Sequence, residues 1–257
     1  MEIVALRATV TCIAMGVFLL IYDWHLFRIH LKDLWCFLGT GIMSIVFFNY
    51  CYFKAMTVAS LSVAAVLLYT APAIVMVLSY FLFQEAFTKQ KVLALLLTFI
   101  GCILVTSVIT NPGTVTGAGI LAGLGAGFGY ALYSIFSRYA LQKGYSSWTI
   151  NFYTYLTCSV GCAFLCDWKL IGQAVTLGTS AVAWMIAMAF FTCFLAFILY
   201  TKGLEQVESS QASILASVEP IVATILGAIC FQEYITVSGI IGIALFLVGM
   251  FVLIYKQ

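Results

Sequence analysis

The sequence predicts an all-α integral membrane protein with nine transmembrane helices, built as an inverted five-helix repeat that lacks its first helix. Composition and block pattern support this class. Apolar residues make up 64% of the 257 residues and charged residues only 8%, too few to cover the surface of a soluble domain. Mean hydropathy is +1.14. The apolar residues form nine blocks, each close to the roughly 20 residues that a helix needs to span a bilayer.

The nine predicted spans are separated by short polar gaps, and none shows the period-2 alternation of a transmembrane barrel. They cover residues 3–22, 34–53, 61–83, 92–109, 117–136, 148–166, 182–200, 212–231 and 237–254. Almost no chain remains for a soluble domain, so we expect no nucleic-acid partner and no nucleotide site. We also expect no cofactor and no metal, because the nine cysteines contain no Cys-x-x-Cys pair.

The basic residues are distributed unevenly over the loops, and Lys and Arg accumulate on the cytoplasmic side of membrane proteins. Three fall on one side of the predicted spans, namely Arg7, Lys54 and Lys169. Eight fall on the other side, namely Arg28, Lys32, Lys89, Lys91, Arg138, Lys143, Lys202 and Lys256. For a multi-pass protein of the cytoplasmic membrane, this places the C-terminus in the cytoplasm and, with nine spans, the N-terminus outside.

Part of the sequence repeats after a shift of 148 residues. Without any gap, 13 of the 54 positions from Tyr52 to Val105 are identical to their counterparts. The informative matches are Lys54 with Lys202, Pro72 with Pro220, Phe83-Gln84-Glu85 with Phe231-Gln232-Glu233, Thr88 with Thr236, and Gly101 with Gly249. Their common spacing indicates an internal duplication rather than chance similarity between apolar segments.

An odd number of spans, five, separates each repeated span from its copy, so the two copies are inverted relative to each other in the membrane. Inverted repeats are a recurrent architecture of secondary transporters, whose substrate site lies near the bilayer midplane between the halves. The span at 117–136 has no counterpart in the first half. The shift makes that counterpart end about a dozen residues before Met1, and we expect an upstream segment that encodes it.

With these features the chain resembles the drug/metabolite transporter superfamily, specifically its EamA-type members. The resemblance rests on "ALR" at residues 5–7 and on the segments 52–85 and 200–233, each of which contains the Pro and the Phe-Gln-Glu. It implies ten spans in two inverted halves, here residues 1–110, without the first helix, and 111–257. It also implies a secondary transporter that moves small metabolites, amino acids or related compounds, across the cytoplasmic membrane, as an exporter by alternating access.

Glu219 is the main candidate for transport chemistry, because it places a carboxylate beside Pro220 about halfway along an apolar span. An acidic residue at the centre of a transmembrane helix costs about 2.5–3.5 kcal/mol on translocon-type scales. The first repeat has Ala71 at this position, so the fold does not require a carboxylate there. Three roles are open: binding a coupling proton, binding a substrate ammonium group, or a structural hydrogen bond to a neighbouring helix.

Polar side chains in other spans are candidates for the same space. A metabolite pocket is mostly apolar and aromatic with a few placed polar groups, although Tyr is also enriched at membrane interfaces. The further candidates for substrate binding or proton coupling are Asn49, Tyr52, Tyr130, Tyr133, Asn151 and Tyr155. The expected partners are a small-molecule substrate, the lipid bilayer and a candidate coupling proton.

Features that occur in both repeats are expected to serve the fold. The two repeated prolines remove a backbone donor and should kink their spans. The two carboxylates of the Phe-Gln-Glu runs lie at helix ends and are expected to fix the turns, and glycines every four residues in 117–136 allow close packing or form a cavity wall. The predicted structural residues are Pro72, Pro220, Glu85, Glu233, Gly123 and Gly127.

The competing function classes are an intramembrane enzyme and a non-transporting membrane partner or channel subunit. An enzyme in the bilayer needs paired carboxylates, a His-rich metal site or a nucleophile with its base. The sequence offers one midplane carboxylate without a basic or metal-binding partner, so we do not expect an enzyme. Saturable transport of one class of metabolite would separate a carrier from a channel or partner subunit.

The charge distribution and the inverted repeat together predict the topology. A reporter fused after Gln257 should lie in the cytoplasm, and an epitope tag in the loop at 111–113 should lie outside. Comparing tag accessibility in intact and permeabilised cells measures both positions. Two tags on the same side of the membrane would contradict the inverted repeat.

Overall fold

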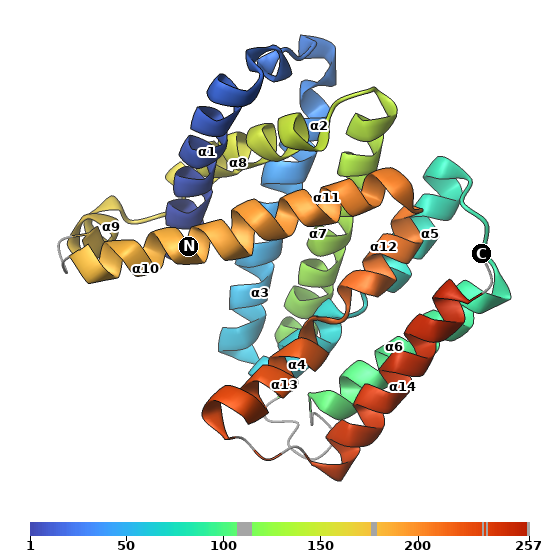
Figure 1. The fold of residues 1–257 in the computed structure, drawn as a ribbon. Helices are drawn as coiled ribbons and strands as arrows, with labels where there is room; N and C mark the ends of the chain where they lie inside the picture. Colours follow the sequence, from blue (N-terminus) through green and yellow to red (C-terminus); the bar gives the residue numbers. More distant parts are fainter. Residues whose placement is uncertain (107–114, 176–178, 233, 235, 256–257) are drawn as a thin grey trace. The chain divides into compact units, whose positions relative to one another are not determined.

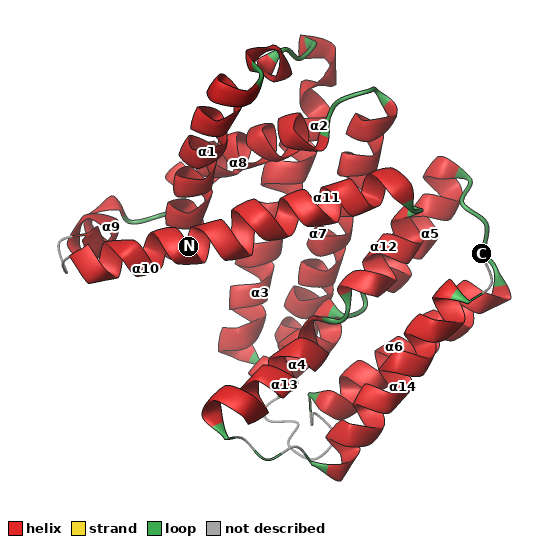
Figure 2. Ribbon diagram, viewed as in Figure 1, coloured by secondary structure: helices red, strands yellow, loops and turns green. Residues whose placement is uncertain are grey.

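The computed structural model describes residues 1–106, 115–175, 179–232, 234 and 236–255. Within this part of the chain all regular elements are helices and there is no strand (Figure 2), so the predicted all-α class is confirmed. The chain divides into two compact units. Unit 1 consists of Met1–Tyr50 and Leu132–Gln206, and unit 2 of Cys51–Ala131 and Val207–Gln257.

Unit 1 is built around α1 and α8, which pack against each other and against the neighbouring helices. Its elements are α1 (Glu2–Tyr22), the short turns η1 (Trp24–Phe27) and η2 (Leu31–Asp33), α2 (Leu34–Leu38), the π-helical η3 (Gly39–Val46), α8 (Ser147–Ala163), α9 (Trp168–Val175), α10 (Thr179–Ala189), the π-helical η4 (Phe190–Leu195) and α11 (Ala196–Gln206).

Unit 2 contains three pairs of helices that are equivalent under the repeat. They are α4 (Leu61–Leu68) and α12 (Ser209–Ala216), α5 (Ala71–Phe83) and α13 (Glu219–Phe231), and α6 (Lys89–Val105) and α14 (Val237–Ile254). Two long helices, α3 (Phe47–Val58) and α7 (Gly117–Gln142), contribute residues to both units. Each compact unit therefore contains chain from both predicted repeats.

Seven helical segments in the described part of the chain are long and apolar enough to cross a membrane. They are Glu2–Tyr22, Leu31–Val58, Leu61–Phe83, Gly117–Gln142, Val182–Gln206, Ser209–Phe231 and Val237–Ile254. By this measure the predicted count of nine spans is too high. The other two predicted spans, 92–109 and 148–166, overlap the helices α6 and α8, which have 17 residues each. At about 1.5 Å per residue, helices of this length are at the lower limit for crossing the roughly 30 Å hydrocarbon core.

The 148-residue repeat also governs the secondary structure of unit 2 (Figure 1). Equivalent helices begin in the same register, at Leu61 and Ser209, at Ala71 and Glu219, and at Lys89 and Val237. α5 and α13 both end in a Gln with left-handed backbone conformation, with φ of 57° at Gln84 and 56° at Gln232. Because non-glycine residues rarely adopt positive φ, this shared turn is a specific local feature of both copies.

The repeat-equivalent helices α6 and α14 lie side by side in unit 2 (Figure 1). A Cβ atom on Gly101 would lie 2.7 Å from the carbonyl oxygen of Gly242, and one on Gly249 would lie 3.1 Å from that of Ala94. Residue numbers thus rise along α6 while they fall along α14, so the two helices run antiparallel. A span and its copy point in opposite directions, as an inverted repeat requires.

The equivalent helices α1 and α8 of unit 1 show the same antiparallel relationship. Near one end of the pair, the rings of Phe18 and Trp148 lie 4.6 Å apart between centroids. Near the other end, the N–H of Asp167, just after α8, donates to Glu2 Oε1 at 3.4 Å. The inverted arrangement of the copies therefore holds in each unit taken by itself.

The close approach of α6 and α14 leads to a stability prediction. Ala is normally preferred over Gly within a helix by about 1 kcal/mol, but a Cβ at Gly242 would lie 2.7 Å from the carbonyl oxygen of Gly101. We expect Gly242→Ala to lower the free energy of unfolding by about 1–3 kcal/mol, because the helices must move apart. Thermal unfolding in detergent measures the change.

The matched control is Gly203→Ala on α11, where a Cβ would meet no atom within 4 Å. This variant should be neutral or slightly stabilised. Equal destabilisation by both substitutions would show that the α6–α14 contact is not the cause.

Candidate functional site

Both copies of one membrane span are interrupted near their middle. In the second copy α12 ends at Ala216 and α13 begins at Glu219; in the first copy α4 ends at Leu68 and α5 begins at Ala71. The prolines that the sequence predicts to kink these spans occupy the first turn of α5 and of α13. Each span is therefore a pair of half-helices, which exposes backbone polar groups that a continuous helix would pair internally.

A small pocket lies where the two interruptions meet in unit 2. About 230 Å³ of space, part of it open to solvent, lies between its lining residues. Its lining residues are Leu68, Tyr69, Ala71, Pro72, Tyr130, Ala216, Ser217 and Glu219. Apart from Tyr130 on α7, all of them lie in the two interruptions, so the pocket is at the interface between the two copies of the repeat.

Glu219 is the acidic group of this pocket. The Tyr130 hydroxyl donates to Glu219 Oε1 at 3.1 Å, and Tyr69 lines the same pocket. The side chain is exposed, and among the described residues no basic nitrogen lies within salt-bridge distance of it. The carboxylate can therefore bind a proton or a cationic group. The hydrogen bond from Tyr130 is also compatible with the third role, a structural hydrogen bond to a neighbouring helix.

A second group of predicted site residues forms a buried hydrogen-bond cluster in unit 1. The Tyr133 hydroxyl donates to Asn151 Oδ1 at 3.1 Å and lies 2.8 Å from Thr201 Oγ1. Asn151 Nδ2 donates to Thr201 Oγ1 at 3.1 Å and to the carbonyl oxygen of Ser147 at 2.8 Å. These contacts join α7, α8 and α11, and they satisfy the polar groups of the cluster mutually.

Two further candidates also lie in unit 1. Asn49 Nδ2 donates to the carbonyl oxygen of Ile45 at 2.8 Å, within the same span. Tyr155 is 1% exposed and its ring packs edge-on against Phe197 at 5.4 Å. Asn49 is thus engaged in a local hydrogen bond, and the Tyr155 ring in local packing.

The structure therefore brings together two of the seven predicted site residues in one pocket, namely Tyr130 and Glu219, whereas Tyr52 on α3 is not among the lining residues. Sequence reasoning missed Tyr69 and Ser217 in the pocket and Thr201 in the unit 1 cluster. Tyr69 and Ser217 are repeat-equivalent and precede the prolines by three residues. Their position in both copies was the signal that could have identified them.

Metal binding has no support within the part of the chain that the structure describes. No three His, Cys, Asp or Glu side chains gather there to hold an ion, and the nine cysteines are free.

Comparison with known proteins identifies the family. The family model described as "EamA-like transporter family" matches residues 1–107 and 117–255. The chain belongs to the EamA-like transporter family. A relative in Archaeoglobus fulgidus, an uncharacterized transporter, is 31% identical over 201 residues, which are 78% of this chain and 70% of the relative. The uncharacterized transporter YwfM of Bacillus subtilis is 28% identical over 244 residues, 93% of this chain and 80% of YwfM.

A solved crystal structure has the same fold as this EamA-like transporter. Its TM-score is 0.79 at 18% identity, and the match covers 99% of this chain and 86% of that chain. The resemblance to the family stated from the sequence is confirmed. The chain is a multi-pass membrane transporter and not an enzyme.

The repeated glycines of this EamA-like transporter lie against α4. A Cβ on Gly123 would come within 2.5 Å of the Leu67 side chain, and one on Gly127 within 2.7 Å of Thr70 Oγ1 and 3.0 Å of the Leu67 carbonyl oxygen. These glycines let α7 pass close to the interrupted span, next to the pocket. The sequence left two roles open for these glycines, close packing or a cavity wall. Their contacts with protein atoms favour close packing.

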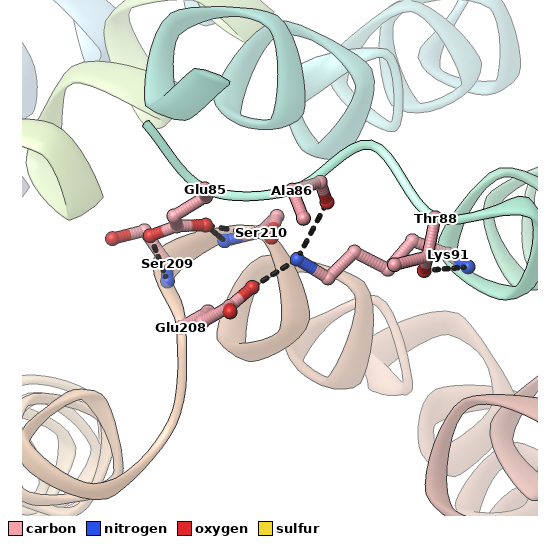
Figure 3. Close-up of polar contacts among 7 residues, drawn as sticks. All are labelled: Glu85, Ala86, Thr88, Lys91, Glu208, Ser209 and Ser210. Carbon is pink, nitrogen blue, oxygen red and sulfur yellow. Dashed lines mark hydrogen bonds and ion pairs between the residues drawn. The ribbon is translucent and has the colours of Figure 1, made fainter. Parts of the chain in front are cut away.

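Glu85 stabilises a helix distant from it in the sequence rather than its own turn. Its Oε1 accepts the N–H of Ser209 at 2.8 Å, and its Oε2 accepts the N–H and the hydroxyl of Ser210 at 3.1 and 2.7 Å. Glu85 thus caps the first turn of α12 (Figure 3). Its predicted counterpart Glu233 lies outside the described residues, as do the loop at 111–113 and Lys256.

Burial opposes the charged form of Glu85, but the hydrogen bonds from Ser210 and Ser209 outweigh it and lower the pKa of the carboxyl below its ordinary value. A carboxyl with a depressed folded-state pKa stabilises the fold above its unfolded-state pKa. That contribution is lost as the pH falls through the folded-state pKa. The stability of unit 2 should therefore decrease on acidification below the ordinary Glu pKa of about 4.3.

We expect Glu85→Gln to lower the free energy of unfolding at neutral pH by about 1–3 kcal/mol, the range for hydrogen bonds to a charged group. The variant should also be less sensitive to acid than the parent, because the titrating group is gone. Thermal unfolding in detergent at several pH values measures both effects. Asp167→Asn, at an exposed carboxylate, is the control, and an unchanged acid dependence in Glu85→Gln would refute the assignment.

Proposed function

We propose that this transporter is a secondary carrier that exports small metabolites, amino acids or related compounds, across the cytoplasmic membrane by alternating access. The observation that carries the proposal is the pocket at which both interrupted spans meet around a single carboxylate. Inverted-repeat carriers bind substrate and coupling ions where discontinuous helices meet at the repeat interface. The antiparallel packing of α6 with α14 supports the same architecture.

The lining of the pocket favours a small substrate. The lining combines apolar residues with three residues that carry hydroxyl groups, Tyr69, Tyr130 and Ser217, and with the Glu219 carboxylate. Such a site suits a compact molecule with an amino group and a short apolar part.

Glu219 is proposed to bind the coupling proton or the substrate ammonium group. Its equivalent position in the first copy is Ala71, which lines the same pocket. The fold forms an interruption with either residue, whereas the carboxylate costs about 2.5–3.5 kcal/mol within a membrane span. One hydrogen bond from Tyr130 offsets about 1.5–3 kcal/mol of this cost. A proton or a cation bound during transport neutralises the carboxylate and lowers the cost of burying it further.

The proposed orientation has the C-terminus in the cytoplasm, as the distribution of Lys and Arg indicates. In this orientation the loop between α5 and α6 faces the cytoplasm, together with Lys89 and Lys91 in the first turn of α6. The pocket then lies between this loop and the opposite surface, and alternating access would open it to each side in turn.

We expect Glu219→Gln to insert and fold, because Gln keeps the size and hydrogen bonding of the side chain. Transport should fall by about tenfold or more, since a lost charged hydrogen bond of roughly 1.5–3 kcal/mol corresponds to at least that factor. Counterflow in proteoliposomes with a panel of amino acids and related metabolites measures it. Glu219→Asp, which keeps the charge, should retain part of the activity.

The pH profile of transport separates the two roles of Glu219. A proton carrier loses its pH dependence in Glu219→Gln, whereas an ammonium ligand loses mainly substrate affinity. Tyr130→Phe removes only the hydroxyl donor and should alter the profile less. A well-expressed Glu219→Gln variant with unchanged uptake and pH profile would make this carboxylate structural.

A further inference from the structure

A cluster of polar contacts fastens α12 to the loop between α5 and α6 in unit 2 (Figure 3). Besides the Glu85 cap, Lys91 Nζ donates to the carbonyl oxygen of Ala86 at 3.0 Å and forms an ion pair with Glu208. Lys91 is only 4% exposed although it is a lysine. We call the set Glu85, Lys91, Glu208, Ser209 and Ser210 the α12 latch.

The two copies begin this span differently at the equivalent residues Ser60 and Glu208. In the first copy, Ser60 caps α4 from within its own chain segment, since its side chain accepts the N–H of Val63 at 3.3 Å. In the second copy the equivalent residue is Glu208, whose side chain makes no capping bond to α12. It pairs with Lys91 instead, and Glu85 supplies the cap from across the structure. The start of α12 therefore depends on contacts with a different part of unit 2.

The ion pair of the latch is present in only one copy of the repeat. The equivalents of Lys91 and Glu208 are Gly239 and Ser60, which cannot form a salt bridge. Because the copies are inverted, these residues belong to the opposite membrane surface. At these equivalent positions, unit 2 thus has an ion pair at one membrane surface and two uncharged residues at the other.

Helix packing has the same asymmetry. α12 packs against α5 at the latch end, whereas the equivalent helices α4 and α13, both fully described, make no comparable packing contact. In an inverted-repeat carrier, such a difference between equivalent contacts corresponds to one end being closed and the other open. α12 is eight residues long and leads directly from Ser209 to the pocket residues Ala216 and Ser217. Movement at its start therefore moves the pocket wall.

We propose that the α12 latch is a one-sided gate, which closes the path from the cytoplasmic end of unit 2 to the Glu219 pocket and opens once in each transport cycle. This rests on the proposed function, because a gate has a role only in a carrier that alternates. The ion pair makes the cytoplasmic end the more firmly closed of the two. Removing it should shift the population of carriers toward the state open to the cytoplasm.

The experiment measures access to the pocket from each side. Ala216→Cys, in a background whose nine native cysteines are replaced, is labelled with a membrane-impermeant thiol reagent in inside-out and right-side-out vesicles. Glu208→Ser is the informative variant, because it removes the ion pair but restores the serine cap of the first copy. Lys91→Gln tests the other partner, and Lys89→Gln, at an exposed lysine one half-turn away, is the matched control.

We expect Glu208→Ser and Lys91→Gln to raise the labelling rate from the cytoplasmic side by about threefold or more and to lower the external rate, since the two states exchange population. Lys89→Gln should behave like the parent. The swap Lys91→Glu with Glu208→Lys should restore the parental ratio of the two rates. Each variant is first checked for insertion and monodispersity, and Glu208→Ser remains informative if Lys91→Gln does not fold.

Two results would overturn the latch. Labelling that rises equally from both sides would indicate local loosening of α12, and labelling that changes from neither side would show that the ion pair does not hold the gate. The assay contains no substrate, so it reads the latch even if Glu219→Gln leaves transport intact. Conversely, a Glu219-dependent carrier with an unresponsive latch would disprove only the gate.

Discussion

The backbone groups at the two helix interruptions must find partners inside the protein, because lipid offers none. Unit 2 provides them from its own side chains. Thr70 Oγ1 donates to the carbonyl oxygen of Leu67 at 2.7 Å, and the Cys102 thiol donates to that of Ser217 at 3.8 Å. Gly127 allows α7 to pass close to the same Leu67 carbonyl. The positions of the two interruptions determine where the pocket forms, where Glu219 lies and where the half-helix α12 ends.

Much of this architecture could be predicted from the amino-acid sequence. The apolar blocks predict an all-α membrane protein because only closed hydrogen bonding within each helix is stable in lipid. The 148-residue register predicts equivalent interruptions, since Pro72 and Pro220 enforce the same local geometry in both copies. The number of spans was harder to predict. Hydropathy does not specify where a helix ends, and the block at 148–166 has a helix only to Ala163.

The contacts that depend on packing between helices could not be predicted. Glu85 is 124 residues from Ser209 in the chain, and no local pattern indicates that its carboxylate caps that helix. Periodicity identifies the face of a helix that carries Tyr52 or Tyr133, but not the helix that this face meets. For this reason the predicted site residues separated into a pocket group with Glu219 and a buried cluster with Asn151. Comparison of equivalent positions in the two copies distinguishes Glu219, which aligns with Ala71, from structural residues such as Pro72 and Pro220, which occur in both copies.

The pairing of α6 with α14 has a consequence for biosynthesis. The equivalent starts of these helices are 148 residues apart in the chain, and translation at about 5–20 residues per second needs roughly 7–30 s to cover that distance. During this interval α6 is already made, but the helix that packs against Gly101 does not yet exist. The cell must keep this narrow glycine surface free of other helices until the C-terminal end of the chain emerges.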